Sequence, residues 1–177
     1  IFLTFIFMIL LFIPGIWTKA LSLLIFLSAS ATDYYDGRVA RNRNQISNFG
    51  KILDPIADKI LVIGAFLVFL ELKLVNSWMV IIIIFRELII TGLRFFAMGK
   101  GKVLAAERIG KHKTISQILA IFVILVYLVL REFGLRFGFW SENIELFSRA
   151  AIFIVMIITV ILTVISGVSY LWQNRSL

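Results

Sequence analysis

The sequence predicts an all-α integral membrane protein with six transmembrane helices, organised as one domain over residues 1–177. Its composition supports this prediction, because 61% of the 177 residues are hydrophobic, only 16% are charged and the mean hydropathy is +1.02. A soluble domain carries about 45–50% apolar and about 25% charged residues. In addition, apolar stretches of roughly the length that crosses a bilayer recur along the chain. A soluble globular fold is therefore excluded.

The first apolar stretch, residues 1–13, ends at Pro14 and is shorter than the roughly 20 residues that a spanning helix needs. Because the chain begins with Ile1 and not with Met, we expect the N-terminal part of this helix to be missing. As helices, the five later stretches would satisfy their own backbone hydrogen bonds in lipid. Gly64 and Gly92 within them would allow close helix packing. The five stretches are residues 21–40, 54–72, 78–98, 115–130 and 147–172.

The chain has 18 Lys and Arg against 10 Asp and Glu, a net charge of +8. Ten of the 18 cations lie in segments 38–51 and 99–113 and in the C-terminal tail. The positive-inside rule places these segments, and with them both termini, in the cytoplasm. In so apolar a chain, the excess charge indicates anionic lipid or phosphorylated substrates as partners and no nucleic acid. The absence of cysteine and the single histidine, His112, exclude thiolate and multi-histidine metal sites.

All four aspartates of the chain fall between residues 33 and 58. Asp33 and Asp36 end one predicted helix, and Asp54 and Asp58 begin the next. Carboxylates beside hydrocarbon are costly, so they indicate a functional site. Helical spacing places the first pair on one face with Gly37, Ala40 and Arg41, and the second pair on one face with Gly50. A short connection should pack the two helices antiparallel, which brings the four carboxylates together.

Four convergent carboxylates repel one another unless cations join them. Ligands that are all oxygen atoms favour a hard divalent ion, Mg²⁺ or Mn²⁺, and two such ions could bridge phosphate oxygens. Gly37 and Ala40 would let a ligand approach the helix backbone, and Arg41 could neutralise a phosphate. The pattern therefore predicts a metal-dependent enzyme that acts on a phosphate or diphosphate.

The same residues read Asp-x2-Asp-Gly-x2-Ala-Arg-x8-Gly-x3-Asp-x3-Asp from Asp33 to Asp58. This run resembles the signature of the CDP-alcohol phosphatidyltransferase family, and each of its eight fixed positions matches. The resemblance implies the six-helix transmembrane fold of that family as a single catalytic domain. It also implies a homodimer in a bacterial cytoplasmic membrane, with the active site facing the cytoplasm.

The resemblance further implies a reaction in which an alcohol displaces CMP from CDP-diacylglycerol. Asp33, Asp36 and Asp54 resemble metal ligands of the family. Asp58 resembles the general base on the acceptor hydroxyl, within reach of metal. The positions that resemble the family's CDP-binding residues are Asp33, Gly37, Ala40, Arg41 and Gly50.

The acceptor is indicated by segments 49–59, 86–87, 91–94 and 110–114. They are similar to bacterial members of the family that use sn-glycerol 3-phosphate and form phosphatidylglycerophosphate. Arg86 and Arg94 lie eight residues apart, so they share a helix face, and Lys111 and Lys113 precede the next helix. We expect these four cations to bind the acceptor phosphate. Inositol phosphate, serine and phosphatidylglycerol stay open as alternative acceptors.

Two other classes of protein cluster aspartates. A membrane prenyltransferase also binds Mg²⁺ and diphosphate, but through two separated aspartate-rich motifs on a larger number of helices. A cation transporter usually shows repeats or broken helices at mid-membrane, and Arg41 would repel its cargo. Both are remote alternatives.

Overall fold

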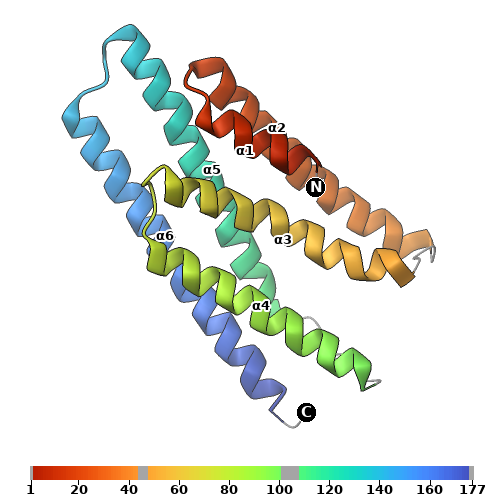
Figure 1. The fold of residues 1–177 in the computed structure, drawn as a ribbon. Helices are drawn as coiled ribbons and strands as arrows, with labels where there is room; N and C mark the ends of the chain where they lie inside the picture. The colour runs from red at the N-terminus through yellow and green to blue at the C-terminus, as the bar shows by residue number, and fades with distance from the viewer. Residues whose placement is uncertain (1, 44–47, 101–107, 176–177) are drawn as a thin grey trace.

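The computed structural model describes the backbone of residues 2–43, 48–100 and 108–175, and the side chains of residues 2–32, 59–100 and 113–175. Within these residues the chain is all-α, and the prediction of six helices is confirmed (Figure 1). The helices are α1 (Phe2–Phe12), α2 (Ile16–Arg43), α3 (Asn48–Glu71), α4 (Ser77–Gly99), α5 (Arg108–Phe137) and α6 (Glu142–Gln173).

The helices form one bundle in which α6 packs on α4 and α5, α2 packs on α1 and α5, and α3 contacts α1, α4 and α5. The end of α2, the start of α3, the end of α4, the start of α5 and the C-terminus lie toward the lower right of Figure 1. The turns between α1 and α2, between α3 and α4 and between α5 and α6 lie toward the upper left. The described parts of the segments that the charge pattern assigns to one side of a membrane therefore share one end of the bundle.

Helices α2 to α6 are longer than the apolar stretches that predict them. Helix α2 extends the stretch 21–40 at both ends, and α5 extends the stretch 115–130 by about two turns at each end. Hydropathy marks only the part of a helix that suits lipid. Helical hydrogen bonding continues through polar residues such as Arg and Lys, which have good helix propensity.

A sharp corner separates α1 from α2. Pro14 has no N–H to continue the first helix, and Gly15 has a φ of +127°, which favours glycine. The Gly15 N–H donates to Glu132 Oε2 on α5 over 3.1 Å. The buried Lys19 ammonium donates to the Leu11 carbonyl at the end of α1. These contacts fix the corner against α5.

The turn between α5 and α6 is similarly specified by the sequence. Gly138 has a φ of +75°. Gly134 lies under an indole ring, because a Cβ at this position would approach Trp140 Cε3 to 2.6 Å. Ser141 caps α6 by accepting a hydrogen bond from the Ile144 N–H over 3.4 Å. The two long helices are therefore joined by a tight, capped turn.

Phenylalanine side chains fill the core between α1, α2 and α3, where the rings of Phe7 and Phe26 lie 5.9 Å apart. The expected role of Gly64 is confirmed, because a Cβ there would lie 3.0 Å from Met8 Sδ on α1. The same expectation for Gly92 is wrong. Nothing lies within 4 Å of a Cβ at Gly92, which is on an exposed part of α4.

Two helices of the described chain are long and apolar enough to cross a membrane by themselves: Lys113–Phe137 within α5 and all of α6. In α4, three charged residues, Arg86, Glu87 and Arg94, interrupt an otherwise apolar sequence. All three charged side chains have polar partners on the neighbouring helices.

Candidate functional site

The eight signature residues lie on two helices that end and begin at the same end of the bundle. Their helical placement is confirmed, but their side chains lie outside the described residues, so the convergence of the carboxylates stays a prediction. Asp33, Asp36, Gly37, Ala40 and Arg41 belong to α2, and Gly50, Asp54 and Asp58 belong to α3.

Lys59 follows Asp58 directly and is the first described side chain of α3. Its ammonium donates to Thr91 Oγ1 on α4 and lies 3.8 Å from Glu87 Oε2. Thr91 Oγ1 in turn donates to the Glu87 carbonyl oxygen over 2.7 Å. Lys59 therefore joins α3, one residue after Asp58, to the middle of α4.

Glu87 is the centre of a polar cluster that joins three helices. Its side chain is almost completely buried, and so is that of Lys113 on α5, whose ammonium donates to Glu87 Oε1. Arg86 Nη1 lies 3.6 Å from the same oxygen, and Gln117 Nε2 donates to it over 3.4 Å. We call Glu87 with Lys59, Arg86, Lys113 and Gln117 the Glu87 cluster. Because Glu87 and Lys113 are buried, removing either side chain would leave an uncompensated charge and would be costly.

Arg86 and Arg94 both contact α6, which confirms that they share a side of α4. Arg86 Nη2 donates to Ser166 Oγ over 2.8 Å. Arg94 Nε donates to the Tyr170 hydroxyl over 3.3 Å, and its guanidinium lies 5.4 Å from the centre of the Tyr170 ring. Ser166 and Tyr170 are one helical turn apart, so α6 supplies a polar stripe that holds both arginines.

Of the four predicted phosphate-binding cations, the structure brings two together and places a third apart from them. Arg86 and Lys113 meet at one oxygen of Glu87. Arg94 stands further toward the end of α4, on Tyr170. Lys111 belongs to the first turn of α5, and its side chain lies outside the described residues.

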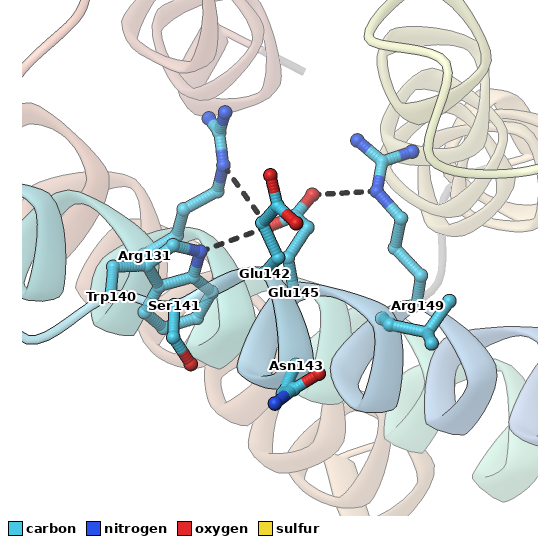
Figure 2. A pocket seen from close by; sticks show the side chains of 8 residues that line it. Arg131, Trp140, Ser141, Glu142, Asn143, Glu145 and Arg149 are labelled. Carbon is cyan, nitrogen blue, oxygen red and sulfur yellow. Dashed lines mark hydrogen bonds and ion pairs between the residues drawn. The ribbon is translucent and has the colours of Figure 1, made fainter.

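A second polar cluster lies at the other end of the bundle, in an open pocket beside the turn between α5 and α6 (Figure 2). At its centre is Glu145, which lies 3.5 Å from Arg131 Nε. It accepts hydrogen bonds from Trp140 Nε1 over 3.0 Å and from Arg149 Nε over 2.6 Å. We call this the Glu145 cluster. The turn between α5 and α6 lies at the opposite end of the bundle from the helix ends that carry the aspartates, so this cluster is not part of the candidate site (Figure 1).

From the sequence alone, Glu87 has no assigned role of its own, whereas the structure places it at the centre of the cluster. Glu87 is the only acidic residue in the stretch 78–98. A single acid in a predicted membrane span is costly unless it has partners, and that signal could have identified the cluster. Ser166 and Tyr170 gave no such signal, because hydroxyl groups are common in apolar helices.

Comparison with the sequences of known proteins shows which family this chain resembles. The profile of the CDP-alcohol phosphatidyltransferase family matches residues 1–172. A relative from Bacillus subtilis (strain 168) is 39% identical over 151 residues, which cover 85% of this chain and 72% of the relative. One from Treponema pallidum (strain Nichols) is 34% identical over 150 residues, covering 85% and 68%. One from Salmonella typhimurium (strain LT2) is 38% identical over 154 residues, covering 82% and 79%. All three are named CDP-diacylglycerol–glycerol-3-phosphate 3-phosphatidyltransferase.

Proposed function

The chain belongs to the CDP-alcohol phosphatidyltransferase family, and on that premise we propose that it transfers the phosphatidyl group of CDP-diacylglycerol to sn-glycerol 3-phosphate. The products are CMP and phosphatidylglycerophosphate. The observation that carries the choice of acceptor is the shared name of relatives at 34–39% identity that cover most of the chain. The cations on α4 and α5 support the same choice, because they could neutralise the phosphate group of the acceptor.

A divalent metal fits the donor set of this chain. Asp33 and Asp36 lie one turn apart near the end of α2, and Asp54 and Asp58 lie one turn apart near the start of α3. Carboxylate oxygens are the ligands that Mg²⁺ and Mn²⁺ prefer. These four residues would hold one or two such ions, which would neutralise charge on the diphosphate.

The proposed step is a direct displacement at the phosphorus atom that carries the diacylglycerol. The acceptor hydroxyl oxygen bonds to this phosphorus, while the bond from the phosphorus to CMP breaks and CMP leaves with the electron pair. The Asp58 carboxylate takes the hydroxyl proton, a role that requires only hydrogen-bond reach. Gly37, Ala40 and Gly50 leave room for the nucleotide, and Arg41 binds its phosphate.

The phosphate of the acceptor is proposed to bind Arg86, Arg94, Lys111 and Lys113. Glu87 brings Arg86 and Lys113 together, and Lys59, the residue that follows Asp58, joins α3 to the same carboxylate. This arrangement would hold the phosphate end of the acceptor on α4 and α5. Its hydroxyl end would then reach toward α3.

We further propose that all six helices span the bacterial cytoplasmic membrane, as a homodimer with both termini and the site in the cytoplasm. Large apolar side chains cover the outside of the bundle, including Trp17 and Phe147, each more than three-quarters exposed. Such a surface suits lipid and not water. The distribution of Lys and Arg supports the orientation.

The decisive experiment is an assay of the purified protein with CDP-diacylglycerol and one acceptor at a time. We expect release of CMP with sn-glycerol 3-phosphate and little with inositol phosphate, serine or phosphatidylglycerol. Preferred turnover of any of the other three would overturn the acceptor. Absence of CMP release with all four would overturn the transferase itself.

A further inference from the structure

The two oxygens of Glu87 face different parts of the proposed site. Oε1 contacts Lys113, Arg86 and Gln117, and Oε2 faces Lys59 on α3. One buried carboxylate therefore links the helix that carries Asp58 to two of the cations that we assign to the acceptor phosphate.

We propose that Glu87 is a positioning residue for the acceptor: it sets where Arg86 and Lys113 present their charges, without contacting the substrate itself. This inference rests on the proposed function. A carboxylate in direct contact with a dianionic phosphate would repel it. Glu87 is instead buried and surrounded by cations, so it acts on the phosphate through them.

Removing this charge would change the positions of the cations. Three positive groups that now converge on one carboxylate would repel one another in a buried environment, where charge interactions are strong. Lys113 has a flexible stem and would move most readily. Arg86 would keep its hydrogen bond to Ser166, so the two cations would no longer present their charges in the same arrangement.

Glu87→Gln tests this role, because it keeps the side-chain size and removes the charge. We expect the KM for sn-glycerol 3-phosphate to rise about tenfold or more, as when one charge-assisted hydrogen bond is lost. The KM for CDP-diacylglycerol should stay within about twofold, below the range of a lost hydrogen bond. The matched control is Glu145→Gln, the same change at a carboxylate with two arginine partners at the other end of the bundle. It should leave both KM values unchanged.

A double-mutant cycle separates positioning from general stability. If Glu87 acts through Lys113, adding Glu87→Gln to Lys113→Gln should raise the acceptor KM much less than Glu87→Gln does alone. Equal effects in both backgrounds would overturn the inference, as would a normal acceptor KM in the single variant. If Glu87→Gln fails to fold, comparing the double variant with Lys113→Gln decides the question: a further large rise in acceptor KM refutes the inference. Failure of the unmodified protein to use sn-glycerol 3-phosphate would instead refute the proposed function, and the inference with it.

Discussion

Replacing Gly167 with alanine should impair use of the phosphorylated acceptor, although the new methyl group would touch neither substrate. Gly167 is buried on the side of α6 that contacts α4. A Cβ at this position would lie 3.1 Å from Arg86 Cγ and 3.8 Å from Arg86 Nε. The first of these distances is shorter than an ordinary van der Waals contact, so Arg86 Cγ would have to move by a few tenths of an ångström.

That movement would displace the guanidinium group. Arg86 Nη2 donates to Ser166 Oγ over 2.8 Å, and an N–H···O bond is poor beyond about 3.2 Å. A hydrogen bond from a charged donor contributes about 1.5–3 kcal/mol, and a shift of this size would weaken it without breaking it. We therefore expect kcat/KM for sn-glycerol 3-phosphate to fall by up to about tenfold.

Gly92→Ala is the control, because it makes the same substitution in α4 where nothing lies within 4 Å of the new Cβ. Both changes favour the helix by about 1 kcal/mol through propensity. The assay is steady-state kinetics with each substrate varied in turn, together with the Tm of both variants. The KM for CDP-diacylglycerol should be normal in both. If Gly167→Ala shows the same acceptor kinetics as Gly92→Ala, then the position of Arg86 does not matter for the acceptor, and the reasoning is refuted.

Three further outcomes follow from the proposed function. EDTA should abolish activity and Mg²⁺ or Mn²⁺ should restore it, whereas full turnover in metal-free buffer would contradict a metal-dependent reaction. Asp58→Asn should block transfer but largely keep CDP-lipid binding. Asp33→Asn should also weaken metal-dependent nucleotide binding. If both variants lose nucleotide affinity equally, Asp58 is mainly a metal ligand and not the general base. Arg86→Ala and Arg94→Ala should each lower kcat/KM for sn-glycerol 3-phosphate by roughly 10- to 150-fold, with CDP-lipid affinity nearly unchanged. For the unmodified protein, glycerol should be a very poor acceptor because it lacks the phosphate. Normal acceptor kinetics in both arginine variants would remove them from the phosphate site.

The helices could be predicted from the sequence because each is marked by a long apolar run, and the breaks are marked by local chemistry such as Pro14 and Gly15. The first and last residues of the helices were harder to predict from the sequence. Helix α5 begins among polar residues, where hydropathy gives no signal, although helical hydrogen bonding continues there. Gly64 and Gly92 looked equivalent in the sequence, and only the packing of α1 against α3 distinguishes them.

The candidate site divides in the same way. The aspartate signature is local in sequence, so its spacing alone places it on two helices. The Glu87 cluster joins residues 59, 86, 87, 113 and 117, and no local pattern connects these positions. Which cation Glu87 pairs with depends on how α3, α4 and α5 are placed in space. The same is true of Ser166 and Tyr170, whose partners lie 80 and 76 residues away.

The half-buried Trp140 at the turn between α5 and α6 allows the state of this helical hairpin to be followed by tryptophan fluorescence. Trp140 lies over Gly134 and donates to Glu145, whereas Trp17, Trp78 and Trp172 are exposed on the outside of the bundle. A quencher dissolved in the surrounding detergent or lipid reaches the three exposed indoles directly. The emission that remains is enriched in that of Trp140. Its wavelength reports whether the end of the bundle remote from the aspartates is intact, independently of whether the enzyme turns over.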